Sequence, residues 1–385
     1  MVLMLRNDLT RPRIAHLTSA HPAHDNRIFD RECRYLAARG YDVTLIAPHA
    51  RDETIDNVRI RAVPPASSRR QRMSHVVPAV YRRAVEEDAD LYHFHDPELI
   101  PLALLLCRRN KKVVYDVHED YPSTIRYSSW LPHRVRGTAA LCFREFERYA
   151  SRRFSALIGA NSEIARRISP LNPHTIAIGN YPSLKDYPFE PRFDDARYTA
   201  GALVSFGGIS GRTCTHAIVE ALRLIPATVN ANLLLGGSVW SKALFTAVTQ
   251  DPGWSRVTYA RELPVRMMLQ QLLTASVAFI LFSPEPNHFG VGSNRLFEAL
   301  AAGVPVITSN FPNWKELVNG TGCGMAVNPT DPRAIAEAVT YLLSHPAEAA
   351  AMGRRGYELA AKQFNWELES CKLDELYREL LDGNQ

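Results

Sequence analysis

Two neighbouring segments of the chain end hydrophobic runs with histidines and carboxylates. HFHDPEL places His93, His95 and Asp96 after the first run, and YDVHEDYP places His118 and Glu119 after the next. A histidine at such a position can polarise or orient a hydroxyl group, and carboxylates can assist it. The sequence therefore predicts a polar site in which His95 contacts the ligand, whereas His93 is packed in the interior.

A third polar segment, SAHPAHDNRIFDREC, follows the first hydrophobic run of the chain. His21 and His24 lie in its loop, and Asp25 and Arg27 open the helix that follows. An aspartate at this position is a good helix N-cap, which is the economical interpretation of Asp25. Arg27 and His21 remain candidates for contacts with a ligand.

The spacing of these residues does not predict a metal site. No HExxH motif is present, and the histidines and carboxylates follow no fixed chelating pattern. The six cysteines are scattered without CxxC spacing, which suggests neither a zinc site nor a disulfide framework and fits a reducing cytoplasm.

Two glycine-containing loops in the second half of the chain could bind an anion. SFGGISGRTC contains Gly208 and Arg212, and glycines allow the backbone to approach a phosphate while a guanidinium binds it. This loop matches neither GxGxxG nor the Walker pattern, so by itself it is weak evidence.

The second loop leads into GVGSNRLFEALAAGVPVITS. Gly292 precedes Ser293 and Asn294, either of which can cap a helix whose free N–H groups would face a diphosphate. Glu298 lies one turn farther on, where its carboxylate could accept hydrogen bonds from a ribose diol. The alternative is an ordinary capped helix with Glu298 on its solvent face.

The elements that must position these loops alternate between short strands and amphipathic helices, which predicts two doubly wound α/β domains with parallel sheets. The predicted strands are 14–18, 43–47, 91–94, 113–116, 156–159 and 175–178 in the first half, and 202–206, 232–236, 257–260, 277–282, 304–308 and 324–327 in the second. The predicted helices are 27–38, 98–109, 162–168, 213–224, 265–274, 294–302 and 332–344. Ligands of such sheets bind beyond the carboxyl ends of the strands, so a cleft between two such domains is the expected site.

The chain has 385 residues, which allows two domains. Residues 1–180 form the first predicted domain, the proline-containing stretch 181–199 a linker, and residues 200–363 the second domain. No apolar run is long enough to span a bilayer, and no signal peptide is recognisable.

Basic residues are concentrated in the first half of the chain. The segment 126–154 interleaves arginines with aromatic and aliphatic residues, which is compatible with a helix on an anionic membrane surface and equally with a solvated helix that has an ordinary core face. No zinc-finger or single-strand-binding signature accompanies the charge, so nucleic acid is not an expected partner.

Several blocks, in order along the chain, resemble the bacterial glycosyltransferases of family 4, which have the GT-B architecture of two facing Rossmann-like domains. The blocks are HPAHDNRIFDRECRYLAARGYDVTLIAP, HFHDPEL, YDVHEDYP, FGGISG, SNRLFEALAAGVPVITSNFPNWKELV and GCGMAVNPTDPRAIAEAV. The resemblance implies that the first domain binds an acceptor and the second a nucleotide-diphosphate sugar. It also implies that residues 364–385 form a helix that returns to the first domain.

The resemblance assigns roles to individual residues. Glu298 matches the glutamate that holds the ribose, Gly292, Ser293 and Asn294 match the loop that faces the diphosphate, and His95 matches the histidine near the donor sugar. His21, Arg27, Asp96, His118 and Glu119 are the candidates for the acceptor or sugar site.

Two positions depart from the family pattern. The first glutamate of the usual E-x7-E motif would fall at Gly290, and Thr213 and Cys214 stand near the place where a basic residue is often found. Arg212 is the best substitute for that cation, and it joins Gly208 in the expected donor site.

The resemblance implies a retaining, metal-independent hexosyltransferase without a cofactor, for which His95, Arg212 and Glu298 are the expected catalytic residues. The expected acceptor is a glycan or a lipid-linked glycan of cell-surface polysaccharide or glycoconjugate synthesis, and the expected location is the cytoplasm with peripheral association at the inner membrane face. The alternatives are a non-catalytic GT-B subunit that binds a sugar nucleotide or a partner, and a sugar-nucleotide epimerase.

Overall fold

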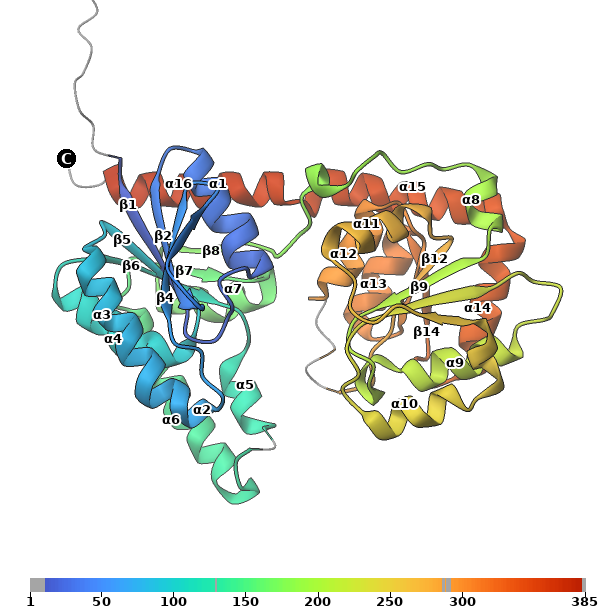
Figure 1. The fold of residues 1–385 in the computed structure, drawn as a ribbon, viewed down its shortest axis with the longest axis horizontal. Coiled ribbons are helices and arrows are strands. Elements are labelled where there is room, and N and C mark those ends of the chain that lie inside the picture. The colour runs from blue at the N-terminus through green and yellow to red at the C-terminus, as the bar shows by residue number, and fades with distance from the viewer. Residues whose placement is uncertain (1–10, 129, 286–287, 289–291, 383–385) are drawn as a thin grey trace, which may run out of the picture. The chain divides into compact units, whose positions relative to one another are not determined.

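The computed structural model describes residues 11–128, 130–285, 288 and 292–382. The chain divides into two compact units, the first comprising Met1–Asn180 with Glu369–Gln385 and the second comprising Tyr181–Leu368. Each unit has its own sheet (Figure 1), and each has its own hydrophobic core. Each is a parallel α/β layer structure of the predicted class.

The first unit contains an eight-stranded sheet with the strand order β3-β4-β2-β1-β5-β6-β7-β8. All of its neighbours are parallel except the antiparallel pair β3–β4. The strands are β1 (Arg13–Leu17), β2 (Asp42–Pro48), β3 (Glu53–Ile55), β4 (Val58–Val63), β5 (Leu91–Phe94), β6 (Lys112–Val117), β7 (Ala156–Gly159) and β8 (Thr175–Ala177).

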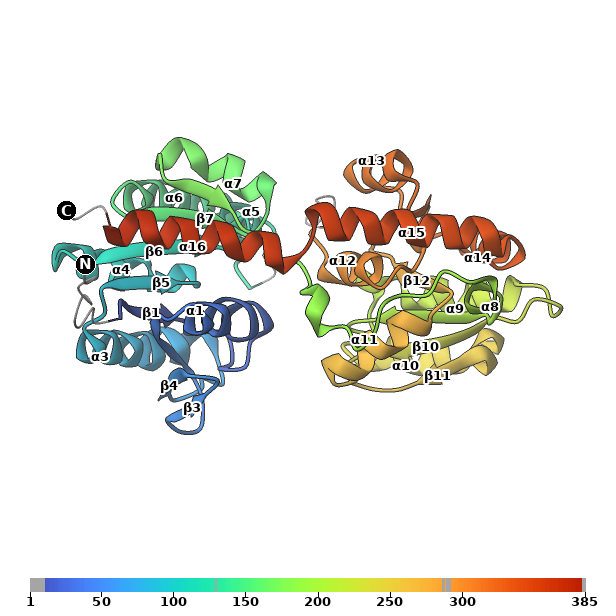
Figure 2. The same cartoon turned by 90° about the horizontal axis from the view of Figure 1, so that it is seen from above.

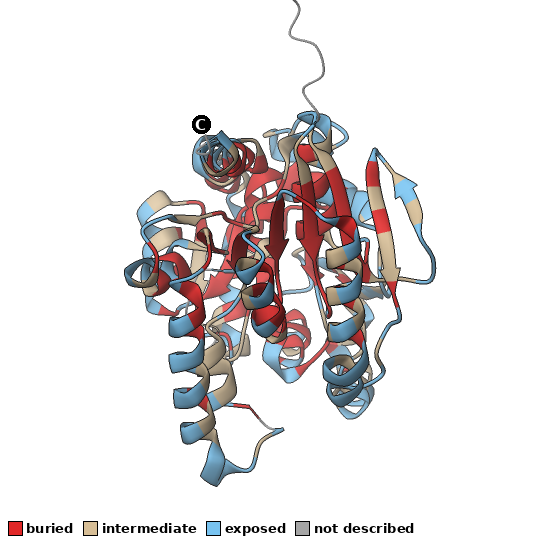
Figure 3. Ribbon diagram, turned by 90° about the vertical axis from the view of Figure 1, so that its left-hand side faces the viewer, coloured by how far each residue is buried: buried red, intermediate tan, exposed pale blue. Residues whose placement is uncertain are grey.

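Helices cover this sheet, and their outward sides are exposed while the central strands are buried (Figure 3). The longer helical segments are η1 (Asn26–Cys33), α1 (Arg34–Ala38), α3 (Val77–Glu87), α4 (Ile100–Arg108), α5 (Tyr121–Arg126), α6 (His133–Ser151) and α7 (Ser162–Ile168). The short segments are α2 (Arg69–Gln71), η2 (Arg72–Val76), η3 (Pro97–Leu99) and η4 (Ser169–Leu171).

Alternate residues of the central strands point to opposite faces of the sheet. Leu17 and Phe94 join one hydrophobic cluster. His16 and His93 are cross-strand partners in the parallel pair β1–β5, and their side chains point to the opposite face from Leu17 and Phe94. Neither histidine belongs to the hydrophobic cluster. One face of the sheet centre is therefore apolar, and the other carries buried histidines beside apolar residues such as Ile14 and Leu91.

The second unit contains a six-stranded parallel sheet with the order β11-β10-β9-β12-β13-β14. Its strands are β9 (Ala202–Phe206), β10 (Asn232–Gly236), β11 (Val257–Tyr259), β12 (Val277–Ile280), β13 (Val306–Ser309) and β14 (Gly324–Val327). Its helical segments are η5 (Leu184–Asp186), α8 (Asp195–Thr199), η6 (Gly211–Thr213), α9 (Thr215–Leu224), α10 (Lys242–Thr249), η7 (Pro252–Arg256), α11 (Val265–Thr274), α12 (Asn294–Ala301), α13 (Pro312–Thr321), α14 (Pro332–Ser344) and α15 (Pro346–Gln363). Figure 2 shows α11 and α12 beside the strands of this unit.

Both sheets contain a switch point, where the strand order reverses. It lies between β1 and β5 in the first sheet and between β9 and β12 in the second. The loops that leave such a pair diverge to opposite faces of the sheet and leave a crevice at its carboxyl edge, which is where open α/β sheets bind ligands. The histidine-containing loops SAHPAHD and HFHDPEL follow β1 and β5, and the two glycine loops follow β9 and β12.

The predicted linker 181–199 is not a free connection, because it belongs to the second unit. Arg197 and Tyr198 of α8 are buried, and the Tyr198 hydroxyl donates to the carbonyl of Gly303 at 3.1 Å. The prolines and charged residues of this stretch gave no indication in the sequence that Arg197 and Tyr198 are buried.

The final helix, α16 (Trp366–Asp382), starts in the second unit, and from Glu369 onward it belongs to the first. Asp374 on this helix accepts hydrogen bonds from Arg39 Nη2 and from the Tyr41 hydroxyl, both at 3.0 Å. Among the described residues, no helix combines the length and apolar character needed to cross a bilayer.

The hairpin of β3 and β4 was not predicted. Asp56 and Asn57 form its turn with φ values of 50° and 62°, the left-handed pair that a two-residue hairpin requires. The alternation in VRIRAV was a signal for β4, since Val58 and Ile60 are buried and the arginine between them is not.

Candidate functional site

In the second unit, a glycine loop follows β9 at the switch point. Gly207 has a φ of 123°, a conformation that L side chains rarely adopt. A Cβ at Gly208 would lie 2.2 Å from the indole of Trp240, so only glycine allows this ring to pack against the loop. Trp240 keeps 66% of its surface exposed and is a candidate binding residue that sequence reasoning missed.

The loop after β12 lies next to the glycine loop. The Ser283 amide donates to the Arg212 carbonyl at 2.8 Å, and the Arg212 guanidinium lies 3.6 Å from the Glu285 carboxylate. Arg212 is nevertheless 66% exposed, so its charge is accessible to an anionic ligand. The structure thus places Gly208 and Arg212 in one loop that contacts the loop leading to α12.

Helix α12 begins at Asn294 after the N-cap residue Ser293, whose side chain makes no capping hydrogen bond. Gly292 is exposed just before the cap, and Gly290 lies outside the described residues. Glu298 is only 8% exposed, so the alternative that it lies on a solvent face of the helix is wrong. It borders a small space beside the strands, together with Arg295.

Arg295 is a second residue that sequence reasoning missed. Its guanidinium donates to the carbonyl of Phe206 at 2.6 Å and lies over the ring of Phe282, 4.5 Å from its centroid. Burial lowers the pKa of Arg295 to about 10, although the Glu298 charge opposes this shift. Arg295 thereby ties the start of α12 to the end of β9 and fixes the geometry of the switch point.

In the first unit, the loop after β1 is ordered by two carboxylates. Asp25 is the N-cap of η1, as expected, and accepts from the amides of Arg27 and Ile28 at 2.9 and 3.0 Å. Asp96 accepts from the Thr18 hydroxyl at 2.7 Å and from the Ser19 amide at 2.6 Å. Asp96 is buried, so its contacts are made with the loop.

His21 lies at the exposed side of this arrangement. Its Nδ1 lies 3.3 Å from Asp25, and its Nε2 lies 3.5 Å from Asp96. Burial opposes the charged form of His21, but the hydrogen bond to Asp25 and the charge of Asp96 outweigh it and raise the pKa. For Asp25, burial acts in the opposite sense, and the His21 hydrogen bond and backbone donors lower its pKa to about 2.

Beneath this loop, Arg27 and Asp116 form a buried ion pair. The Arg27 Nε and Nη2 donate to the two Asp116 oxygens at 2.8 and 3.0 Å, and Nη1 donates to the Ile178 carbonyl at 3.0 Å. Burial alone would raise the pKa of Asp116, but the Arg27 charge holds it well below its usual range. Arg27, a candidate for the acceptor site, is therefore occupied with internal contacts.

The structure does not bring His95 to a surface. Its exposure is 0%, and its Nδ1 lies 3.2 Å from Asp116 and 3.3 Å from Nε2 of His118. Burial lowers the pKa of His95 to about 4, even though Asp116 raises it. The expectation of direct ligand contact by His95 is not met within this unit, because side chains of β1, η1 and β6 surround its ring: His16, Glu32 and Asp116. His93 is buried as expected.

His118 and Glu119 follow β6 and are more accessible. His118 is partly buried and lies 3.0 Å from Asp116 through its Nε2, while Glu119 is exposed and accepts from the Thr124 hydroxyl at 3.2 Å. The first unit therefore presents His21, His118 and Glu119 around a buried network that holds their positions. Such groups can hydrogen-bond polar hydroxyl groups, whereas the second unit presents backbone and a guanidinium suited to phosphate.

The fold and these switch-point loops define two Rossmann-like units of the GT-B architecture. A model of "Glycosyltransferase Family 4" matches residues 26–176, and a model of "Glycosyl transferases group 1" matches residues 203–359. Together these two models account for most of both units, and the chain belongs to the glycosyltransferases of family 4.

Individual relatives agree with this membership. A GDP-mannose-dependent alpha-(1-6)-phosphatidylinositol monomannoside mannosyltransferase from Mycolicibacterium smegmatis is 29% identical over 42% of this chain and 42% of its own length, so the match spans less than half of that relative. Sucrose-phosphate synthase from Thermosynechococcus elongatus superposes with a TM-score of 0.73 and 19% identity, covering 97% of this chain and 100% of its own. HepE from Anabaena, solved in complex with UDP and glucose, gives 0.70 and 15%, covering 96% of this chain and 100% of its own. At these identities, the two solved structures establish the fold.

Proposed function

We propose that this protein transfers a sugar from a nucleotide-diphosphate sugar to a hydroxyl of an acceptor. The observation that carries the proposal is the pair of loops at the β9–β12 switch point, where Gly208, exposed Arg212 and the start of α12 converge. A glycine backbone, a guanidinium and free helix N–H groups are the donors that a diphosphate requires. The complex of HepE with UDP and glucose and the mannosyltransferase that depends on GDP-mannose support this ligand class.

In the proposed reaction, the bond between the anomeric carbon and the diphosphate breaks, and a bond to the acceptor oxygen forms with retention of configuration. The acceptor proton leaves with the nucleoside diphosphate. Arg212 and the N–H groups before Leu296 stabilise the negative charge that develops on the departing diphosphate. These fixed donors need no metal ion to do so, and the transfer is proposed to be metal-independent.

The nucleoside end of the donor would use Glu298 and Trp240. Glu298 accepts hydrogen bonds from the ribose hydroxyls, and the exposed indole of Trp240 offers a face on which a base stacks. The relatives include a GDP-mannose-dependent mannosyltransferase and a protein solved in complex with UDP, so the base must be identified by measurement.

The first unit would bind the acceptor. His21, His118 and Glu119 supply the accessible polar groups, and His95, Arg27 and Asp96 act as positioning residues from below. Replacing His118 should lower turnover with a smaller loss of nucleotide affinity, because His118 belongs to the unit that does not bind the nucleotide.

The test is calorimetric titration of the full chain with UDP, GDP, ADP and TDP and with their hexose derivatives, first without metal and then with Mg²⁺. We expect one family of nucleotides to bind without metal, and Glu298→Gln and Arg212→Gln each to weaken it by about tenfold or more. Arg192→Gln, on an exposed arginine of the same unit, is the matched control and should bind as the native chain does. Binding that requires Mg²⁺, or that both site variants leave unchanged, would contradict the proposal.

The same titration separates the alternatives. An epimerase would convert the bound sugar nucleotide with no acceptor added, which nuclear magnetic resonance of the sugar would detect. A non-catalytic subunit would bind the donor and return it unchanged when a mixture of glycan and lipid-linked acceptors is supplied. A transferase releases the nucleoside diphosphate only with an acceptor.

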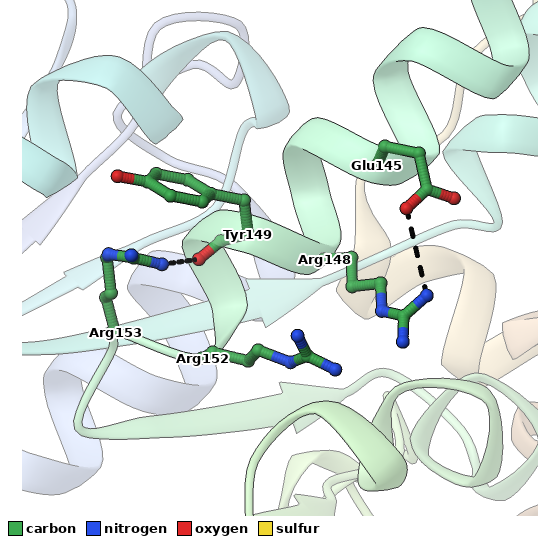
Figure 4. Close-up of a pocket in the computed structure, with 5 residues that line it drawn as sticks. All are labelled: Glu145, Arg148, Tyr149, Arg152 and Arg153. Carbon is green, nitrogen blue, oxygen red and sulfur yellow. Dashed lines mark hydrogen bonds and ion pairs between the residues drawn. The ribbon is translucent and has the colours of Figure 1, made fainter.

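A second proposal concerns the surface of α6, which would hold the protein at an anionic membrane where a lipid-linked acceptor resides. Large apolar side chains on this helix are exposed, among them Leu141, Phe146 and Tyr149. Arginines accompany them, and near the end of the helix Arg148, Arg152 and Arg153 line one shallow hollow with Tyr149 and Glu145 (Figure 4). Apolar and basic side chains on one helix are the combination that binds anionic lipid surfaces.

Sedimentation with vesicles containing one-third phosphatidylglycerol tests this second proposal. The triple variant with glutamine at Arg134, Arg136 and Arg144 should lose most of the vesicle binding at 0.1 M salt. The control removes the same number of charges from the exposed surface of the second unit, at Arg266, Arg333 and Lys362. Equal binding by the two variants would refute a role for α6.

A further inference from the structure

The histidine-bearing face of the first sheet carries a buried cluster to which the proposed transfer assigns no contact with a ligand. His16 lies on β1, His93 lies on β5, His95 follows β5 by one residue, and Glu32 lies on η1. All four are fully buried, and one ligand-capable atom of each lies within 4.8 Å of those of the others. The three imidazole rings converge, with centroids 4.5 to 5.4 Å apart.

We propose that this cluster is a structural binding site for a divalent transition-metal ion, with His16, Glu32, His93 and His95 as the ligands and zinc as the preferred ion. Three imidazoles and a carboxylate are a donor set that such ions favour, and four protein ligands in a closed, buried site are typical of structural zinc. The site lies in the first unit and is separate from the proposed donor site.

The distances fit an ion of this size. His16 Nδ1 lies 3.1 Å from His95 Nε2 and 3.6 Å from Glu32 Oε2, and His95 Nε2 lies 3.8 Å from the same oxygen. His93 Nδ1 lies 3.9 Å from Glu32 Oε2 and 2.7 Å from the Tyr377 hydroxyl, a contact that metal binding at this nitrogen would replace. Ligand atoms about 2.1 Å from a tetrahedral ion are separated by about 3.4 Å, so shifts of a few tenths of an ångström complete the site.

The outer contacts of two ligands are those that metal-bound histidines usually make. His95 would bind through Nε2, while its Nδ1 faces the Asp116 carboxylate at 3.2 Å. His16 would bind through Nδ1, while its Nε2 faces the Tyr377 hydroxyl at 3.3 Å. Such partners of the second ring nitrogen fix the tautomer that leaves the other nitrogen free to bind the metal.

Glu32 is a second, independent observation. Both of its carboxylate oxygens are buried without a hydrogen bond, and within the described chain the nearest cation is Arg27 Nε at 3.2 Å, which already donates to Asp116. Two buried carboxylates thus share one guanidinium. A buried carboxylate that accepts no hydrogen bond is costly, and a cation among the three histidines would compensate it.

The alternative is a metal-free network, in which His16 and His95 hydrogen-bond to each other and Glu32 is neutral. Its weakness is that both Glu32 oxygens then have no hydrogen-bonding partner. Local spacing could not reveal the site, because the ligands come from β1, η1 and β5. The bound ion would join these three elements beneath α16.

The test is the metal content of the full chain, expressed in medium that contains zinc, iron, manganese, cobalt, nickel and copper, and dialysed against a chelator to remove surface ions. We expect close to one ion per chain by plasma mass spectrometry, and less than one-tenth for Glu32→Gln and for His93→Asn. The control is His24→Asn, because His24 belongs to an exposed group with His49 and Glu53 that also meets the spacing for a metal. Metal that disappears in this control and persists in Glu32→Gln would overturn the assignment.

Two further measurements keep the proposal testable if a variant fails to fold. X-ray absorption of the native chain should show three to four nitrogen or oxygen ligands near 2.0–2.1 Å with imidazole scattering. Removing the ion with a strong chelator under mild denaturant should lower the melting temperature, and returning zinc should restore it. A native chain with less than one-tenth of an ion, whose melting temperature no added ion raises and which Glu32→Gln leaves equally or more stable, would establish the metal-free network instead.

Discussion

Arg197 should be a principal stabilising residue of the second unit, although it lies in a segment that the sequence predicts as a linker. Its guanidinium donates to the carbonyls of Ala275, Leu272 and Ala302 at 2.9–3.0 Å and to that of Arg192 at 2.8 Å. Three of these contacts are buried, and they tie α8 to the ends of α11 and α12. Burial lowers the pKa of Arg197, so part of the hydrogen-bond energy offsets the cost of burying its charge.

Arg197→Met keeps the length and apolar stem of the side chain and removes every donor. Each buried carbonyl that loses a charged donor lowers the free energy of unfolding by about 1–3 kcal/mol. Because the variant no longer buries a charge, part of this loss is offset, and we expect a net destabilisation of about 2–4 kcal/mol. The stability of Arg197→Lys should lie between those of the native chain and Arg197→Met, because one ammonium cannot reach all four oxygens. The exposed Arg192→Met should change stability by less than about 0.5 kcal/mol.

Urea unfolding monitored by tryptophan fluorescence reports mainly on the second unit, because four of the five tryptophans lie there and only Trp130 lies in the first. A loss below about 1 kcal/mol in Arg197→Met, or equal losses in the Met and Lys variants, would refute the argument that the four hydrogen bonds anchor α8.

Further predictions concern the two switch points and the final helix. Glu285→Gln should tighten binding of the nucleoside diphosphate up to about fivefold in calorimetry, because it frees Arg212 from an exposed ion pair; weaker binding would mean that Glu285 itself contacts the ligand. Asp25→Ala should destabilise the first unit by about 1 kcal/mol and Asp25→Asn by less, in thermal unfolding at neutral pH. Because the folded pKa of Asp25 is lowered to about 2, its contribution is present above the unfolded value near 3.9 and is lost as the pH falls toward 2; an identical acid-unfolding profile for native chain and Asp25→Asn would contradict this. Asp374→Asn should increase amide hydrogen exchange in α16 without affecting α12, because Asp374 connects the helix to Arg39.

The sequence predicts most strands and the parallel class because buried strands are short apolar runs with clear ends. Leu91–Phe94, Ala156–Gly159 and Ala202–Phe206 have the predicted bounds. The hairpin β3–β4 of the first sheet was not predicted, because its strands are half exposed and their alternation is brief. Helices α6 and α15 were not among the predicted elements, since polar and small residues interrupt their apolar stripes.

The site was harder to predict than the fold because burial depends on contacts between distant elements. The resemblance led to the donor loops, but it could not indicate that Arg295 reaches the Phe206 carbonyl or that Trp240 packs on Gly208. Likewise, a histidine after a strand is a reasonable ligand contact until its neighbours in the fold are known; His95 is fully buried beside His16, Glu32 and Asp116. Glu32 carried no local signal at all, because its neighbours are on other elements.

The central claim is that the loops after β9 and β12 bind a nucleotide-diphosphate sugar. Hydrogen exchange with mass spectrometry, comparing the full chain alone and with the nucleotide sugar selected by calorimetry, tests this location most directly. We predict slower exchange in residues 207–214 and 292–298, and less protection of these segments in the Arg212→Gln variant at a ligand concentration near the dissociation constant of the native chain. Protection confined to other segments of the chain, with both loops unchanged at saturating ligand, would contradict the account.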